Sequence, residues 1–483
     1  MKKALSLILA QIMTVMVIPF YVVFAAAPTN VDYEFYNEKS GLTNGKITVE
    51  LPENHGATNL AIYFGNSEGK LQGYTKLASV KIPTGAKQVV FEMPQNVMIP
   101  PSATKLLVYS EKNGTEETEF TAFDLPNDSA YVLEGDAPIS EFFVLSDLHY
   151  GRNADCDRQA KTALNYIAAN ASNIDGIFVV GDAIQGGSVG SGGSTEAKQY
   201  KSLNSMLKAI TGLPKIYPAV GNHESFGWYT GENSDNEGYM KAFADNLRAH
   251  YTHIGISEDW NNPYYSVQIK DFTFIVLGPT KVTSSTEGYL GDEQINWLKD
   301  QLEALEDDRP VFIMLHQPMK NSVAQLIADG SDEWADILDG DKLKSVLKKY
   351  PNVVLFNGHT HYSLTEDANK HMVGGGDEFA VFNTASVKDN EQGLCVSVYK
   401  DKIIVQGIDF SSGDLITSAQ FVLSERYTGP QEEPNTQLPS DDNVTVDKSP
   451  NKGCGGSVFG SGAIIFCTVI SAISVRKKRK KMK

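Results

Sequence analysis

Five short apolar runs in the middle of the chain all end on histidine, aspartate or asparagine. In the clearest case, residues 353–356 lead through Gly358 into His359 and His361. An apolar run of this length that stops at a turn residue is typical of a buried strand. The groups that follow the five runs are, in chain order, Asp147 with His149, Asp182, Asn222 with His223 and Glu224, His316, and His359 with His361. Ligands bind outside the carboxyl ends of strands in open α/β sheets, so we expect all five groups at one rim.

Strand-like and helix-like patterns alternate from Ser140 onward. The predicted strands cover residues 141–145, 176–180, 215–220, 272–277, 311–315, 353–356, 379–382, 394–399 and 402–406. Helical apolar spacing occupies residues 157–170, 197–210, 238–250, 292–305 and 341–349. This alternation indicates an α/β domain whose helices pack outside the sheets.

The preceding segment, residues 28–137, has no good helical pattern. Strand-like runs at 46–51, 60–64, 88–92, 106–109 and 119–123 are separated by turn signals such as Asn44-Gly45 and Asn113-Gly114. Short strands with turns at intervals of about ten residues predict a β-sandwich of immunoglobulin or fibronectin type.

Both ends of the chain carry apolar segments beside basic residues. Lys2 and Lys3, the apolar residues 4–24 and three alanines form the layout of a secretory signal peptide, with an uncleaved anchor helix as the alternative. Residues 457–475 are long enough to span a bilayer, and the basic residues after them mark the cytoplasmic side.

This tail resembles that of surface-anchored proteins of Gram-positive bacteria. The Leu-Pro-x-Thr-Gly sorting motif of those proteins is not matched, because Asp441 follows Leu438-Pro439-Ser440. We therefore expect an exported protein, held at the bacterial cell surface by residues 457–475 with its body outside. The predicted segments are a signal peptide (1–27), the β-sandwich (28–137), the α/β domain (138–425), a proline-rich acidic linker (426–456), the membrane segment (457–475) and a basic tail (476–483).

The acidic body limits the partners that the protein is expected to bind. Removing the signal peptide, the membrane segment and the basic tail takes away nine basic and no acidic residues, which lowers the net charge from −17 to −26. Such a body is expected not to bind nucleic acid or an anionic membrane surface non-specifically.

The polar groups at the strand ends, taken in order, carry a resemblance to a known family. Asp-x-His, Gly-Asp, Gly-Asn-His-Glu, His and Gly-His-Thr-His, spread over roughly residues 140–408, resemble the calcineurin-like metallophosphoesterase superfamily. The resemblance implies a four-layer α/β/β/α sandwich with two metal ions at the strand ends. It also implies hydrolysis of phosphate mono- or diesters, with a small phosphoester as the substrate.

The same resemblance assigns roles to individual residues. Asp147, His149 and His361 would hold one ion, Asn222, His316 and His359 the other, and Asp182 would bridge them. Imidazole and oxygen ligands without thiolates suit Mn, Fe or Zn, and two such ions would bind the phosphoryl oxygens and activate a bridging water. His223 would act as general acid or bind the phosphoryl oxygen, and Glu224 would orient its ring. Arg152 is a candidate phosphate ligand or else a solvated charge.

Two departures from the family pattern narrow the range of activities that we expect. Gln185 stands where purple acid phosphatases have a tyrosine, which argues against a tyrosinate–iron(III) site. Val220 stands where serine/threonine protein phosphatases have an arginine. Monoesterase and diesterase activity both stay open. A non-catalytic surface module and a metal-sensing surface protein are the alternatives, and metal-dependent turnover of an ester would distinguish them from an enzyme.

Overall fold

The computed structural model describes residues 25–36, 41–93, 97–127, 129–132, 137–305, 308–320, 322, 337–365 and 379–423. The predicted linker, membrane segment and basic tail, and residues 1–24 of the predicted signal peptide, lie outside these ranges. None of the helices within the ranges is long and apolar enough to cross a membrane.

The N-terminal part consists of two antiparallel sheets. One has the order β1-β2-β6, and the other has the order β4-β3-β7-β8 with β5 paired to β3. The strands are β1 (Asn30–Glu34), β2 (Lys46–Glu50), β3 (Asn59–Asn66), β4 (Gly69–Lys70), β5 (Ala78–Lys81), β6 (Gln88–Glu92), β7 (Lys105–Lys112) and β8 (Thr115–Asp124). Ile47 and Val49 of one sheet and Leu60 and Leu106 of the other are buried in one core, so the predicted sandwich is confirmed.

Two further sheets form the centre of the second part. The six-stranded sheet has the order β11-β10-β9-β19-β20-β21, and the five-stranded sheet has the order β12-β13-β16-β17-β18. The bounds are β9 (Ser140–Leu145), β10 (Gly176–Val179), β11 (Ile216–Pro218), β12 (Tyr265–Ile269), β13 (Phe272–Val276), β16 (Val311–Met314), β17 (Val353–Asn357), β18 (Ala380–Asn383), β19 (Gln392–Val398), β20 (Ile403–Asp409) and β21 (Leu415–Leu423). Strands β9, β10 and β11 are parallel to one another, as are β13, β16, β17 and β18.

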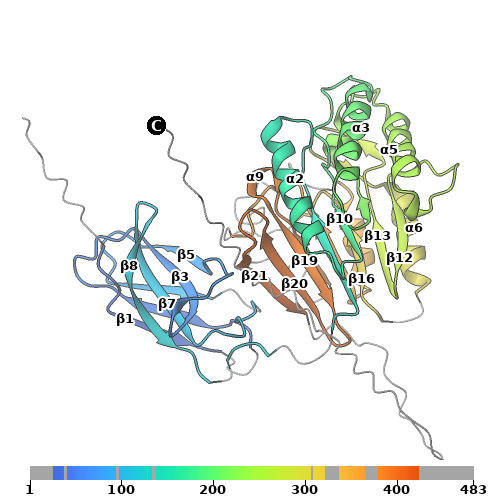
Figure 1. Ribbon diagram of the computed structural model, residues 1–483. Helices are drawn as coiled ribbons and strands as arrows, with labels where there is room; N and C mark the ends of the chain where they lie inside the picture. Colours follow the sequence, from blue (N-terminus) through green and yellow to red (C-terminus); the bar gives the residue numbers. More distant parts are fainter. Residues whose placement is uncertain are drawn as a thin grey trace, which may run out of the picture.

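Helices cover the outer faces of both central sheets (Figure 1). They are α2 (Ala154–Ala169), α3 (Ser194–Lys208), α4 (Asn222–Phe226), α5 (Asn236–His250), α6 (Gly291–Glu303), α8 (Gly340–Leu347) and α9 (Val387–Asn390), with a 3₁₀ turn η1 (Thr252–Ile254) and a small hairpin β14 (Lys281–Val282) and β15 (Gly288–Tyr289). Leu298 of α6 and Leu343 of α8 pack on β16 and β17. Leu164 of α2 and Phe243 of α5 join the core of the other sheet. The predicted four-layer α/β/β/α sandwich is therefore confirmed.

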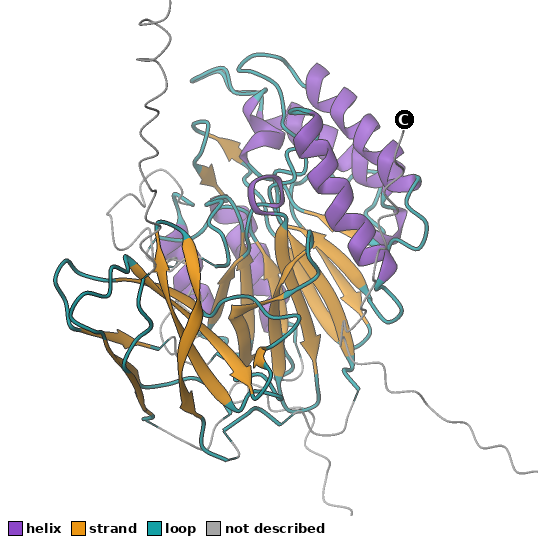
Figure 2. Cartoon of the chain, turned by 60° about the vertical axis from the view of Figure 1, so that its left-hand side comes forward, coloured by secondary structure: helices purple, strands orange, loops and turns teal. Residues whose placement is uncertain are grey.

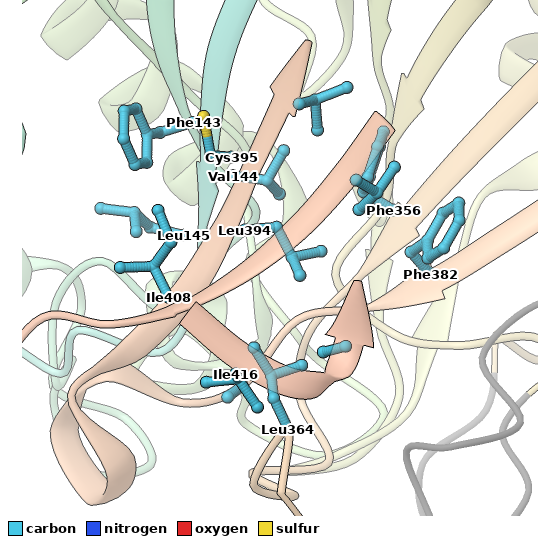
Figure 3. Close-up of a cluster of buried hydrophobic side chains, with 14 of the residues drawn as sticks. Phe143, Val144, Leu145, Phe356, Leu364, Phe382, Leu394, Cys395, Ile408 and Ile416 are labelled. Atoms are coloured by element: carbon cyan, nitrogen blue, oxygen red, sulfur yellow. The ribbon is translucent and has the colours of Figure 1, made fainter. Parts of the chain in front are cut away.

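Aromatic rings fill the space between the two central sheets. The ring of Phe142 on β9 lies 5.0 Å from that of Phe274 and 4.9 Å from that of Phe312, centroid to centroid. A second group of buried side chains lies along β9, β19 and β20 and includes Leu145, Leu394 and Ile408 (Figure 3). Because β9 is buried on both faces, the polar residues that follow it start from a rigid base.

The N-terminal sheets lie beside β21, the edge strand of the six-stranded sheet (Figures 1 and 2). The backbone N–H of Leu415 donates to Gly73 O at 2.9 Å, and the N–H of Met98 donates to Gln420 O at 2.7 Å. The hydroxyl of Thr417 also donates to Thr75 O at 2.5 Å. This edge of the six-stranded sheet is therefore paired with the N-terminal part rather than left open.

Candidate metal centre

The groups at the ends of the five predicted strands meet at one rim, as expected. Asp147 and His149 follow β9, Asp182 follows β10, Asn222 opens α4 after β11, His316 follows β16, and His359 and His361 follow β17. Their ligand atoms form three overlapping groups, each within 4.8 Å: Asp147, His149 and His361; His149, Asp182 and His223; and Asp182, His316 and His359. The two carboxylates and the imidazoles of His149 and His316 are completely or almost completely buried.

In the first group, three potential ligand atoms approach one another. His361 Nε2 lies 2.9 Å from Asp147 Oδ1 and 3.3 Å from His149 Nε2. His149 Nε2 lies 3.6 Å from the same Asp147 oxygen. These three atoms surround a point at which one ion could bind.

In the group of Asp182, His316 and His359, the imidazole of His316 lies between two side-chain oxygens. Its Nε2 is 3.2 Å from Asp182 Oδ2 and 3.1 Å from Asn222 Oδ1. The same Asp182 oxygen lies 3.6 Å from His149 Nε2 of the first group. Asp182 is thus shared by the two groups.

Hydrogen bonds at Nδ1 orient the site imidazoles in the same way. His149 Nδ1 faces Gln185 Oε1 at 3.1 Å, and His316 Nδ1 faces Val180 O at 2.7 Å. Since a carbonyl oxygen can only accept, each Nδ1 carries a proton, and in the neutral ring the lone pair of each Nε2 would point at the carboxylates. Lone pairs of two imidazoles turned toward shared carboxylates fit a cation, and the nitrogen and oxygen donor set suits Mn, Fe or Zn.

The pKa shifts at the rim indicate an environment that favours positive charge. Burial acts to raise the pKa of Asp147, but the charges of His361 and His316 hold it well below its usual range. Burial acts to lower the pKa of His316, but Asp182 and Asp147 raise it to about 9. In the same way, Asp147 raises the pKa of His361 to about 10 against the effect of burial. A metal ion would take the place of these extra protons, because a ligating imidazole must be neutral.

His359 is held differently from the other site imidazoles. Burial and the charge of His316 lower its pKa to about 3, so it is neutral and able to bind a metal at physiological pH. Its backbone N–H donates to Asp147 Oδ2 at 3.0 Å, which connects the two groups a second time.

Five of the site residues have a left-handed backbone, which is uncommon for residues other than glycine. The φ angles are 54° at Asp147, 44° at His149, 50° at Asp182, 70° at His359 and 58° at His361. Within the described ranges, three further non-glycine residues share this conformation: Asn113, Lys270 and Glu391. Each such residue costs of the order of 1 kcal/mol or more and persists only where its surroundings fix it. The concentration of this strain at the rim marks a functional site.

Glu224 does not orient the His223 ring, and that expectation is corrected. Its carboxylate accepts from the backbone N–H groups of Gly221, Asp182 and Ile184 at 2.7, 2.9 and 3.2 Å. Burial and then the charge of Asp182 raise its pKa to about 7. Glu224 therefore ties the loop after β10 to the start of α4 and positions Asp182.

His223 and Arg152 lie at the margin of the site. His223 Nε2 is 3.9 Å from Asp182 Oδ2, and 26% of its side chain is exposed. Its Nδ1 lies 2.6 Å from Gln185 O. Arg152 is exposed, and its backbone N–H donates to His149 O at 3.1 Å.

Sequence reasoning missed three residues that contact the site. Gln185 reaches both His149 and His223, and Lys388 and Asp389 contact His361. Lys388 and Asp389 could have been found from the sequence, because the predicted strand at 379–382 is also followed by polar residues. In the sequence, Gln185 stands out only as the replacement for a tyrosine, which gives no sign of these contacts.

Fold and donor set together define a metal-binding α/β protein. The sequence pattern of the family described as calcineurin-like phosphoesterase matches residues 141–363. The match covers all the ligand residues, and it supports a metal-dependent phosphoric ester hydrolase. No curated protein matches the chain.

Three solved structures resemble the chain at low identity. A purple acid phosphatase from yellow lupin (Lupinus luteus) seeds is 15% identical, with 83% of this chain and 74% of that chain covered and a TM-score of 0.41. GAP50, the anchor in the inner membrane complex of Plasmodium, is 14% identical, with coverage of 59% and 88% and a TM-score of 0.34. A predicted phosphoesterase from Streptococcus pneumoniae TIGR4 is 10% identical, with coverage of 59% and 98% and a TM-score of 0.27.

Gly221 allows the close approach between Asp182 and the start of α4. A Cβ at this position would lie 2.6 Å from Asp182 N and 2.8 Å from His316 Cδ2. We expect Gly221→Ala to displace Asp182 and His316, to lower the free energy of unfolding by about 1–3 kcal/mol and to reduce metal content. Gly340→Ala is the matched control, since its Cβ would meet nothing closer than 3.7 Å. Denaturant unfolding and metal analysis check this, and equal behaviour of the two variants would contradict it.

Proposed function

We propose that the protein hydrolyses small phosphate mono- or diesters, with two metal ions held at the rim. The observation that carries the proposal is the position of Asp182, whose Oδ2 lies 3.2 Å from His316 Nε2 and 3.6 Å from His149 Nε2. A carboxylate shared by two ligand groups is what a dinuclear site requires. Asp147, His149 and His361 hold one ion, and Asn222, His316 and His359 hold the other.

Each group at the rim has a distinct task in this proposal. Bound divalent ions supply Lewis acidity toward phosphoryl oxygens and water. Asp147 and Asp182 offset the positive charge that the ions bring into a buried site. His223 has its Nδ1 proton fixed toward Gln185 O, so when the ring is doubly protonated its partly exposed Nε2 can give the second proton to the leaving group. Arg152 is the candidate for contacts with the outer part of the substrate.

Two variants separate metal binding from proton transfer. Asp182→Ala is expected to lose both ions and all activity, because both ligand groups use this side chain. His223→Ala is expected to keep both ions and to lose about 10²–10⁴-fold in rate, the usual contribution of general acid catalysis. Metal analysis and p-nitrophenyl phosphate turnover on the same samples measure both effects.

His250→Ala, at an exposed position near the end of α5, is the control for replacing a histidine. It is expected to match the wild type in both measurements. Full activity with two bound ions in Asp182→Ala would refute the shared role of Asp182. Loss of metal with an unchanged rate per bound ion in His223→Ala would refute the proton-transfer role.

The charge of the protein favours small substrates. The body carries a net charge of about −26 by the sequence count, and salt screens exposed charges beyond about 8–10 Å, so the ions attract anions only at close range. Lys388 is a basic side chain in contact with His361, but Asp389 pairs with it at 2.6 Å. Long polyanions are therefore repelled on approach, while a single phosphate reaches the rim.

We expect p-nitrophenyl phosphate or its bis ester to be hydrolysed at least about tenfold better, by kcat/KM, than single-stranded DNA or RNA, because repulsion by the acidic body slows polyanion association. Comparing the two esters decides between monoester and diester preference. Efficient nuclease activity at physiological salt would show that the charge argument fails.

The same proposal places the protein outside the cell, held by residues 457–475. The support is the order of basic, apolar and small residues at the N-terminus and the basic cluster after residue 475. Truncation after about Lys452 is expected to release active enzyme into the medium, measured by activity in the cell and medium fractions. Full-length enzyme found entirely in the medium, or facing the cytoplasm, would contradict the proposal.

A further inference from the structure

The short helix α9 contacts two sides of the metal centre. The backbone N–H of Lys388 donates to Asp147 O at 3.1 Å, and the N–H of Val387 donates to Ser146 O at 3.1 Å. The side-chain amide of Asn390 donates to His361 O at 3.0 Å. This helix therefore connects the backbones of Asp147 and His361, whose side chains meet at 2.9 Å in the first ligand group.

Two side chains of α9 compete for the same nitrogen of His361. Asp389 Oδ2 lies 2.8 Å from His361 Nδ1, and Lys388 Nζ lies 3.1 Å from it. The same Asp389 oxygen lies 2.6 Å from Lys388 Nζ. The carboxylate can only accept a hydrogen bond and the ammonium can only donate one, so the two neighbours favour opposite tautomers of the ring.

The choice of tautomer decides whether His361 is able to bind an ion. When Nδ1–H donates to Asp389, the Nε2 lone pair faces Asp147 Oδ1 and His149 Nε2. When Lys388 donates to Nδ1 instead, the proton of the neutral ring sits on Nε2 and blocks that atom. A carboxylate that accepts from the second nitrogen of a ligating imidazole fixes its orientation and raises its basicity.

We propose that Asp389 is a positioning residue that keeps His361 in its metal-binding tautomer and withholds Lys388 from the ring. The inference rests on the proposed function, because it takes His361 as a ligand. The side chain of Lys388 is 7% exposed, so its charge is almost fully shielded from water and is paired with Asp389. Without that carboxylate, Lys388 would donate to the ring and also place an unpaired positive charge beside the ion site.

The test uses four variants of the full chain: Asp389→Ala, Lys388→Met, the double variant and a control. The control is Asp401→Ala, because Asp401 also lies beside a lysine in sequence, pairing with Lys402 at 3.7 Å, but is 74% exposed and far along the chain from the site residues. Binding of Zn²⁺ and of Mn²⁺ is measured by competition with a chelator, which requires no turnover. The ¹⁵N chemical shifts of the His361 ring in the Zn²⁺-loaded protein report which ring nitrogen carries the proton.

Asp389→Ala is expected to lower the affinity for one of the two ions about 10–100-fold and to leave the affinity for the other nearly unchanged. In the Zn²⁺-loaded wild type, the ring signals should show a proton on Nδ1 and none on Nε2. Lys388→Met should bind both ions with at least wild-type affinity, since it removes only the competing donor. The double variant should bind the affected ion more tightly than Asp389→Ala does, because the competing donor and the unpaired charge have gone together. Asp401→Ala should match the wild type.

Different results overturn different parts of the argument. Wild-type ion affinity in Asp389→Ala overturns the positioning role while the proposed function stands. If the double variant binds the affected ion as weakly as Asp389→Ala does, the loss of affinity is only structural. This result also overturns the positioning role of Asp389. Failure of the wild-type protein to bind either ion overturns the proposed function, and the inference with it.

Discussion

The site depends on two carboxylates, Asp147 and Asp182, that remain ionised although they are buried at the ends of the strands. Removing a carboxylate from water costs several kcal/mol unless its charge is offset. Here His359 N–H and His223 N–H each donate to one of them, and the imidazoles of His316 and His361 supply positive charge. In the absence of metal the excess protons sit on imidazole nitrogens that point at the carboxylates. The arrangement of charge is therefore one that a cation can enter by displacing protons, without rebuilding the site.

The fold explains how so many polar groups reach one place. Parallel strands bring their carboxyl ends to the same edge, and each sheet of the sandwich contributes such an edge. The chain must then turn sharply after each strand, and residues such as Asp147, Asp182 and His359 adopt positive φ to do so. Gly358 has no room for a side chain, because a Cβ there would press on Ser146 and Asp147. The rigid, fully buried strands below are what hold these strained turns.

Much of the fold could be predicted from the sequence, since most central strands are continuous apolar runs that end at a turn residue. The strands that escaped prediction lack that pattern. In β21, Thr417, Ser418 and Gln420 are buried polar residues whose partners lie elsewhere in the chain, and β12 is only partly buried. The groups predicted to meet at the rim do meet, because strand order alone brings them there.

Contacts around the ligands could not be predicted in the same way. Glu224 follows His223 directly, but successive residues on a helix point in different directions, so adjacency wrongly suggested a contact between them. Asp389 and His361 are distant in sequence and meet only because β18 pairs with β17 and α9 then hydrogen-bonds to Ser146 and Asp147, just after β9.

The N-terminal part contributes to the site through the sheet rather than through side chains at the rim. β21 is the outermost strand of the sheet that contains β9, and an open edge strand of this length is a template for unwanted pairing. Gly73, Thr75 and Met98 satisfy backbone groups along that edge. Met98 also packs with Tyr399, Ile404 and Val422 in a small apolar cluster on the same side.

Covering the edge in this way holds β21, β20 and β19 in register, and β19 is the direct partner of the strand that leads into Asp147. The geometry of the first ligand group thus depends on packing that begins in a part of the chain with no catalytic residue of its own.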